Sequence, residues 1–258
     1  MPLMTRLSTV LLVLACSATA ASADVRQARD SISMRGRPQV LHLYGVRGTA
    51  PVIVSSGDGG WLHLGPHVAE ALASRGHFVV GFDVKAYLES FTGSATLRPA
   101  DVASDYRMLV DFASSGAATK PILVGVSEGA GLSVLAAADP QLKSKIAGVI
   151  ALGLPERNEL AWRWTDSIIY LTHRPPREPS FSASAIVDRI APVPLAAIHS
   201  THDEFVSVDQ VRQILTRASE PKRLWVVDAA NHRFSDNLGE FDRRLLDAID
   251  WITTHSPR

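Results

Sequence analysis

The sequence predicts a single α/β domain with a mainly parallel central sheet and helices on both faces. After residue 24, short β-rich runs alternate with amphipathic helical patterns, which is typical of such folds. Most of the β-rich runs are continuously apolar, as expected of strands covered on both faces. The chain has 258 residues, of which 46% are hydrophobic, and it contains no internal repeat. This length and composition suffice for a substantial core.

The expected strands follow from residue type. Residues 39–46 alternate apolar and polar side chains, which predicts an edge strand or a hairpin arm. Six further strands are expected in runs rich in β-branched and apolar residues: 50–56, 77–84, 120–127, 146–155, 193–201 and 222–230.

The expected helices carry apolar residues at helical spacing. In 65–76 these are Val68, Ala71 and Leu72, and Gly76 is suited to end the helix. Ser207 is the expected N-terminal cap of a later helix. The other helices are expected at 98–115, 128–139, 207–219 and 239–255.

Composition argues against several functional classes. Lys plus Arg and Asp plus Glu each total 26, so the formal net charge is zero and nothing favours nucleic acid. The single cysteine excludes an internal disulfide and a cysteine-rich metal site. The glycine-rich loop at 55–61 lacks the G-K-[ST] ending of a phosphate loop, and the histidines lack the H-E-x-x-H signature. We therefore expect neither a metal nor a cofactor.

The first 23 residues are expected to be a secretory signal peptide. A basic start at Arg6 precedes an apolar run from Leu7 to Ala15 that is too short to span a bilayer, and small residues follow. Cleavage before Asp24 would release a soluble periplasmic protein, which is the favoured prediction. The lipobox-like sequence that ends at Cys16 makes a lipid anchor the alternative.

The segment VGVSEGAGL, residues 124–132, contains a G-x-S-x-G pattern where an expected strand meets an expected helix. Such a turn presents Ser127 at the carboxyl edge of a parallel sheet. Gly125 and Gly129 leave room for the sharp turn, and Gly131 is expected to let the helix pack closely on the sheet. The pattern also occurs in ordinary glycine-rich loops, so this serine needs partners elsewhere in the chain.

A serine nucleophile requires a base and a group that orients the base. In the α/β-hydrolase arrangement the acid and then the histidine follow the serine along the chain. Asp203 and His232 each come directly after a predicted strand, in that order. Ser127, Asp203 and His232 are therefore the expected catalytic residues. The alternatives are Glu204 for the acid and His199 and His202 for the base.

An oxyanion hole would complete the site. One expected donor is the backbone N–H of Glu128, which follows the nucleophile. The other is expected in the loop SSGDGGW, from Gly57, Asp58 or Gly59, where glycines allow close backbone approach. Together these parts predict the α/β-hydrolase fold with a working serine nucleophile.

Several motifs resemble those of the bacterial virulence protein VirJ/AcvB family of exported α/β-hydrolases. They are SGDGGW, the following LASRGHFVVGFDVKAYLESF, the helix ADVASDYRMLVDFA and the G-x-S-x-G elbow. The resemblance covers nearly the whole chain after the signal segment. It implies a periplasmic esterase that hydrolyses aminoacyl-phosphatidylglycerol, chiefly the lysyl form. It also implies Ser127, Asp203 and His232 at the catalytic positions.

At the elbow the chain departs from this family. The family more often has an aromatic residue before the serine and SFGAD from it, whereas here Val126 precedes the serine and SEGAG follows. Asp58 matches the family's glycine-loop motif. Two roles remain for it: shaping the loop, or recognising a substrate ammonium group.

A long insertion is expected at about residues 156–190, between two predicted strands. In this fold the same position often carries a cap over the active site, and the alternative is a surface excursion with some aromatics in the core. Its residues Trp162, Trp164 and Tyr170 are candidates to contact acyl chains or a membrane surface. The candidate substrate contacts are Trp61, Arg174 and Arg177.

Two classes of function fit these features. The favoured one is a serine esterase, with an aminoacylated phospholipid or another ester as substrate; a small-ester or dienelactone-type hydrolase is the alternative enzyme. The second class is a non-catalytic periplasmic accessory or binding protein, because a fold does not determine a function. The expected partners besides the substrate are the membrane surface and components of a secretion system, and no nucleic acid.

Overall fold

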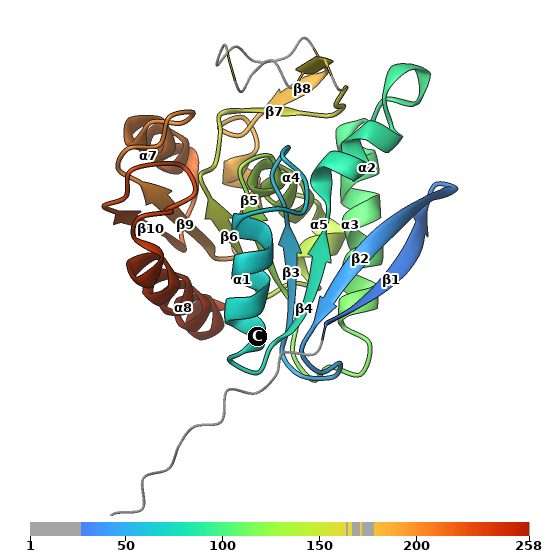
Figure 1. The fold of residues 1–258 in the computed structure, drawn as a ribbon, viewed down its shortest axis with the longest axis horizontal. Helices are drawn as coiled ribbons and strands as arrows, with labels where there is room; N and C mark the ends of the chain where they lie inside the picture. The colour runs from blue at the N-terminus through green and yellow to red at the C-terminus, as the bar shows by residue number, and fades with distance from the viewer. Residues whose placement is uncertain (1–26, 164, 167–170, 172–177, 258) are drawn as a thin grey trace, which may run out of the picture.

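The protein, seen in a computed structural model that describes residues 27–163, 165–166, 171 and 178–257, is built on an eight-stranded sheet (Figure 1). The strand order is β1-β2-β4-β3-β5-β6-β9-β10, with β1 and β2 antiparallel to their neighbours and the other strands parallel. The strands are β1 (Gln27–Met34), β2 (Arg37–Tyr44), β3 (Pro51–Ser55), β4 (Phe78–Phe82), β5 (Ile122–Val126), β6 (Gly148–Leu152), β9 (Leu195–Ser200) and β10 (Lys222–Val227). The prediction of a mainly parallel sheet is confirmed.

Helices cover both faces of this sheet. One face carries α1 (Leu64–Ala73) and α8 (Leu238–His255). The other carries α2 (Val84–Ser90), α3 (Pro99–Ala113), α4 (Glu128–Ala137), α5 (Pro140–Lys143) and α7 (Val208–Arg217), with short 3-10 helices at Gly93–Ala95 and Val187–Ile190. Among the described residues, no helix is long and apolar enough to cross a membrane.

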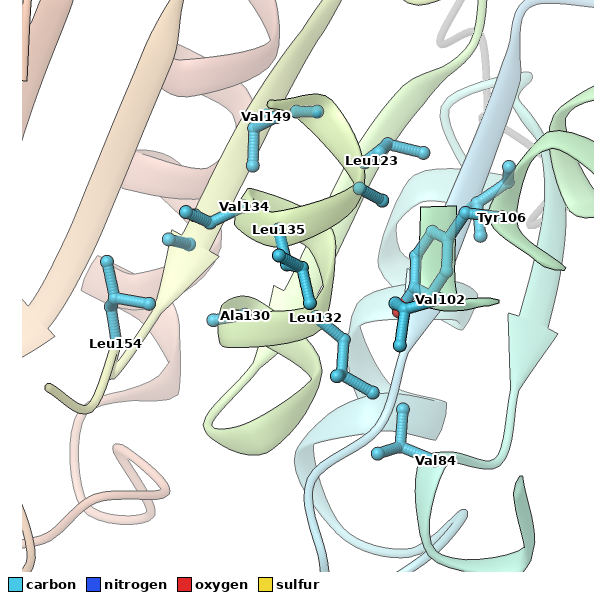
Figure 2. Packing of buried hydrophobic residues seen from close by; sticks show 14 of the residues in the cluster. Val84, Val102, Tyr106, Leu123, Ala130, Leu132, Val134, Leu135, Val149 and Leu154 are labelled. Atoms are coloured by element: carbon cyan, nitrogen blue, oxygen red, sulfur yellow. The ribbon is translucent and has the colours of Figure 1, made fainter. Parts of the chain in front are cut away.

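The core forms two layers, one on each side of the sheet. Every residue of β3, β4, β5, β6 and β9 is buried, which explains their continuous apolar sequences. Figure 2 shows the layer between the sheet and α3 and α4, where Tyr106, Leu123, Leu132 and Val134 lie close together. Each such side chain contributes about 1.5–3 kcal/mol on burial, so this packing fixes the positions of the strand ends.

Two expected helix ends have the predicted chemistry. Gly76 has a φ of 88° just after α1, where its N–H donates to Ala73 O. Ser207 caps α7 by accepting the N–H of Gln210. The sequence pattern missed β1, whose residues are mostly exposed, and α2, which the side chain of Asp83 caps.

The expected signal peptide lies outside the described residues. In the insertion, β7 (Arg157–Glu159) and β8 (Ser180–Ser182) form a separate two-stranded antiparallel sheet. Figure 1 shows this small sheet beyond the carboxyl ends of the parallel strands. Trp162 is only 1% exposed and belongs to the core, which agrees with the alternative of aromatics in the core and not with contact to an acyl chain or membrane surface. Trp164 and Tyr170 lie outside the described residues.

Candidate active site

Ser127 occupies a sharp turn between β5 and α4, with φ 50° and ψ −116°. This conformation is strained for a residue other than glycine, and such strain is concentrated at functional sites. Hydrogen bonds on both sides hold the turn: Ser127 N–H donates to Leu152 O at 2.8 Å, and Ala130 N–H donates to Ser127 O at 2.8 Å. The strand and the helix thus fix the serine in the elbow conformation that the sequence predicts.

Three positions around the serine require glycine, because neighbouring atoms lie too close for a Cβ atom. A Cβ at Gly125 would lie 2.2 Å from Gly129 O, and a Cβ at Gly129 would lie 2.3 Å from Ser56 O. Gly131 differs from expectation, because a Cβ there would lie 1.7 Å from Asn158 Oδ1 of β7. Its missing side chain makes room for the insertion and not for the sheet.

Asp203 and His232 lie together although they come from different loops. His232 Nδ1 is 2.5 Å from Asp203 Oδ2, and the other carboxylate oxygen accepts the N–H groups of Phe205 and Val206 at 2.9 Å. With its Nδ1–H donated to the carboxylate, the neutral imidazole keeps Nε2 as the basic nitrogen. The contact with Asp203 therefore favours the Nδ1–H tautomer, which is the one that a general base requires.

The electrostatics of Asp203 suit this role. Burial alone would raise the pKa of Asp203, but the hydrogen bond and charge of His232, together with two backbone N–H groups, outweigh burial and lower the pKa. The carboxyl group is therefore ionised at neutral pH. An ionised carboxylate stabilises the imidazolium that forms when the histidine accepts a proton.

The alternative acid and bases have other partners. Glu204 Oε2 accepts the backbone N–H of His232 at 2.7 Å, so this carboxylate holds the loop and not the ring. His199 is fully buried in β9, its Nε2–H donates to a backbone carbonyl at 2.8 Å, and burial lowers its pKa. His202 is exposed, with its ring beside the carbonyl oxygen of Ala229.

A cavity of about 460 Å³ brings the predicted groups together. Ser127 and His232 both line it, so the nucleophile and the base open onto the same space. The glycine loop 57–60 and Glu128 form further parts of the wall. This volume lies in the range typical of small-molecule sites.

The residues predicted to form the oxyanion hole lie on the wall of the same cavity as the nucleophile. A Cβ at Gly57 would lie 3.4 Å from Ser127 Cβ, so the glycine loop reaches the serine. Gly60 donates its N–H to Gly57 O at 3.0 Å, which uses that amide within the turn. The expected donors, Glu128 and the stretch 57–59, all line the cavity.

Charges are separated along the cavity wall. Glu128 and Glu159 are buried, Asp58 is half-buried, and Arg157 and Arg233 are exposed. Burial, followed by the charge of Glu159, raises the pKa of Glu128 well above its ordinary value of 4.5. The cavity wall therefore carries buried or half-buried carboxyl groups, among them Glu156, and two exposed arginines.

Trp61 packs away from this cavity. Its ring stacks on His42 at a centroid distance of 4.8 Å, and its Nε1–H donates to Tyr44 Oη at 3.2 Å. A Cβ at Gly81 would lie 2.2 Å from the indole, so the ring covers β4. This position corrects the prediction of Trp61 as a substrate contact: the residue anchors the glycine loop to β2 and β4.

Arg174 and Arg177 lie outside the described residues. Among the described residues, the cavity wall contains Arg157 and Arg233, which sequence reasoning missed although Arg233 directly follows the predicted base. It is also lined by His63, which has a φ of 55° at the start of α1. His63 could not be predicted from the sequence, because no known motif indicates a histidine with positive φ at the start of a helix.

Comparison with known proteins agrees with this architecture. Residues 50–163 match the family described as bacterial virulence protein (VirJ). This segment, which is less than half of the chain, contains the glycine loop, the elbow and β7. No curated protein sequence gives a significant match.

Solved structures resemble nearly the whole chain. The α/β hydrolase GrgF from Penicillium sp. sh18 has a TM-score of 0.65 at 14% identity, over 90% of this chain and 99% of that one. Est1E from Butyrivibrio proteoclasticus has a TM-score of 0.65 at 15% identity, over 88% and 99%. A membrane phospholipase A, described as a novel bacterial virulence factor, has a TM-score of 0.60 at 12% identity, over 88% and 86%. The chain thus has the α/β-hydrolase fold, and its predicted resemblance to the VirJ family is confirmed over residues 50–163.

Proposed function

We propose that the protein is an exported serine esterase that hydrolyses an aminoacyl ester of an anionic phospholipid. The observation that carries the proposal is the arrangement around one cavity. Ser127, in its strained elbow, lines this cavity. His232 lines it as well, and Asp203 contacts the imidazole ring of His232. A serine hydroxyl becomes nucleophilic when a base oriented in this way removes its proton.

In the first step, Ser127 Oγ attacks the carbonyl carbon of the ester while His232 Nε2 accepts the hydroxyl proton. The carbonyl oxygen becomes an oxyanion, which the N–H of Glu128 and one N–H of the stretch 57–59 stabilise. The C–O bond to the lipid then breaks, and His232 returns the proton to the leaving alcohol. The products of this step are the lipid and an aminoacyl ester on Ser127.

In the second step, water attacks the aminoacyl-serine ester. His232 accepts a proton from the water and then donates it to Ser127 Oγ as the acyl bond breaks. The free amino acid leaves, and the enzyme regains its starting protonation state. Asp203 remains ionised throughout and stabilises the imidazolium.

The charges of the cavity favour the substrate class. An aminoacyl ester carries an ammonium group next to the scissile carbonyl, where Asp58 and the buried pair Glu128 and Glu159 would attract it. The phosphate of a phosphodiester lipid lies on the far side of the ester. Exposed Arg157 and Arg233 are the cavity residues suited to bind it.

Apolar side chains near the opening suit a lipid at a membrane surface. Leu62 is 61% exposed and Phe205 is 38% exposed, and both line the cavity. We therefore infer that the protein works at the membrane surface as a peripheral enzyme. The favoured soluble periplasmic form predicts cleavage before Asp24, which N-terminal sequencing of the protein from a periplasmic fraction would establish. Association with secretion-system components is a further proposal, to be tested by co-purification.

The decisive experiment measures lysine release from vesicles that contain lysyl-phosphatidylglycerol. The Ser127→Ala variant should lose activity by about 10³-fold or more, because no other group replaces the nucleophile. Ser144→Ala is the matched control, since Ser144 is exposed on the surface after α5 and bonds only Gln141 O locally. Equal activity of the Ser127→Ala variant and the wild type would refute the proposal.

A fluorophosphonate probe and a substrate panel separate the other functions. Covalent labelling that depends on Ser127 is expected for an esterase, whereas a non-catalytic binding protein would remain unlabelled when folded. If short neutral esters are hydrolysed and lysyl-phosphatidylglycerol is not, the protein is a small-ester hydrolase instead.

A further inference from the structure

Two buried carboxyl groups beside the nucleophile have no proton-transfer part in the proposed chemistry. Glu128 directly follows Ser127 and begins α4, and Glu159 ends β7. Their exposed fractions are only 4% and 5%. Carboxyl groups buried this deeply need hydrogen-bonding partners, a proton or both.

The two residues join the insertion to the elbow helix. Glu128 Oε1 accepts the backbone N–H of Glu159 at 2.7 Å, so the two buried carboxyl groups belong to neighbouring positions of α4 and β7. Next to this contact, Asn158 fills the space that Gly131 leaves on α4. Figure 1 shows β7 on the side of the sheet where α4 begins. Two consecutive residues of β7 are thus seated on the first turns of α4.

The surroundings favour one shared proton on this pair. Burial raises the pKa of Glu128 first, and the charge and hydrogen bond of Glu159 and the charge of Asp58 add to the effect. Burial also raises the pKa of Glu159, although Glu128 and Arg157 oppose this rise. Tyr106 of α3, whose hydroxyl donates to Ser55 Oγ at 2.9 Å, also feels the charge of Glu128; burial is the main cause that raises its pKa, so it stays neutral. Two carboxylates in such contact repel each other when both are ionised.

We propose that Glu128 and Glu159 are positioning residues whose shared proton holds β7 against the nucleophile elbow. Arg157 lies two residues before Glu159 and lines the cavity, so the docking of β7 keeps this arginine in the cavity wall. When the proton leaves, the two carboxylates repel and β7 separates from α4. The part of this inference that concerns substrate rests on the proposed function, whereas the docking of β7 does not.

The direction of the pH effect follows from proton linkage. The docked state holds a proton that the separated carboxyl groups, with ordinary pKa values near 4.5, release. Docking is therefore strongest below about pH 4.5 and weakens as pH rises towards the raised pKa of the pair. For one proton the docking equilibrium falls by up to about tenfold per pH unit in that interval.

Hydrogen–deuterium exchange of peptides that span residues 157–160 tests the docking directly. After correction for the intrinsic pH dependence of exchange, wild-type protection should decrease as pH rises from about 4.5 through the raised pKa of the pair. Glu128→Gln and Glu159→Gln should each remove this decrease, because an amide donates the shared hydrogen bond without a titrating proton. Glu89→Gln on the exposed side of α2 is the control and should behave as the wild type. Wild-type protection that does not depend on pH, or an equal decrease in both Gln variants, would overturn the proposal.

Kinetics then test the effect on the cavity. For lysyl-phosphatidylglycerol, the wild-type KM should rise as pH passes the raised pKa of the pair while kcat changes less, and Glu128→Gln should show a smaller rise. A short neutral ester has no phosphate for Arg157 and should show no such rise in KM. If neither ester is hydrolysed but the exchange data behave as expected, the proposed function fails and the positioning role stands. A rise in KM that is the same for both esters would contradict the link to Arg157.

Discussion

Gly153, which follows β6, offers a sharp test of the proposed base. It has a φ of 62°, and its N–H donates to Ile198 O at 3.1 Å. A Cβ at this position would lie 2.4 Å from His232 Cε1 and 2.9 Å from His232 Nδ1. The change Gly153→Ala therefore adds one methyl group directly against the imidazole.

The size of the effect follows from these distances. Ordinary contact begins at 3.4 Å, so the ring must move by about 1 Å, yet its Nδ1 is held by Asp203 at 2.5 Å. A displacement of about 1 Å in a catalytic group costs about 10²-fold in rate. The strained φ adds about 1–2 kcal/mol of destabilisation and the clash about 1–3 kcal/mol.

Two measurements on the purified variant check this reasoning. The kcat for lysine release should fall by about 10²-fold, and urea unfolding should show a loss of about 2–5 kcal/mol in the free energy of unfolding. Gly239→Ala is the matched control, since a Cβ there meets nothing within 4 Å in α8, and this change should stabilise the protein by about 0.5–1 kcal/mol. A folded Gly153→Ala variant with kcat within twofold of the wild type would show that His232 is not the base or that its ring position is unimportant.

Three further predictions concern the acid and the insertion. Asp203→Asn should reduce kcat by about 10⁴-fold, because the base loses its ionised partner. Glu204→Gln removes only the charge of a group that accepts a backbone hydrogen bond, so it should reduce kcat by less than about tenfold. Steady-state kinetics of the two variants test this difference. The lowered pKa of Asp203 means that its ionised carboxylate stabilises the folded protein; this contribution is complete above pH 3.8 and is lost as pH falls through the lowered pKa. In urea unfolding at acidic pH, the free energy of unfolding should therefore fall less steeply with pH for Asp203→Asn than for the wild type. Gly131→Ala should lower the free energy of unfolding by about 1–3 kcal/mol, because the new methyl group clashes with Asn158. The double variant with Asn158→Ala should recover part of this loss. A double-mutant cycle that shows no coupling between the two positions would contradict the contact.

The sequence was sufficient for the architecture where local chemistry and periodicity agree. The buried strands were predictable because residues covered on both faces must be apolar along their whole length, as in β5 and β6. Asp203 and His232 could be predicted because chain order and strand ends restrict where such residues can stand. By contrast, β1 was not predictable, since most of its side chains are exposed and only its pairing with β2 makes it a strand.

Side-chain environment was the part that local pattern could not supply. Trp61 follows the glycine loop in the sequence, but its ring packs against Gly81 and stacks on His42, away from the cavity. The contact of Gly131 with Asn158 joins residues that are far apart in the chain and carry no common motif. The contacts of Gly131 and Asn158 depend on the tertiary packing of the insertion, which the periodicity of the sequence does not predict.

The insertion and the elbow helix together determine the chemistry of the cavity. The departure from the VirJ-like pattern at Glu128 replaces a frequently aromatic position by a carboxyl group, and Glu159 of β7 provides the group that makes its burial tolerable. Burial and the charge of Asp58 raise the pKa of Glu159, and the hydrogen bond with Glu128 opposes this rise. An aromatic residue in place of Glu128 would remove that opposing contribution and leave Glu159 protonated beside Asp58, so the elbow residue and β7 must change together.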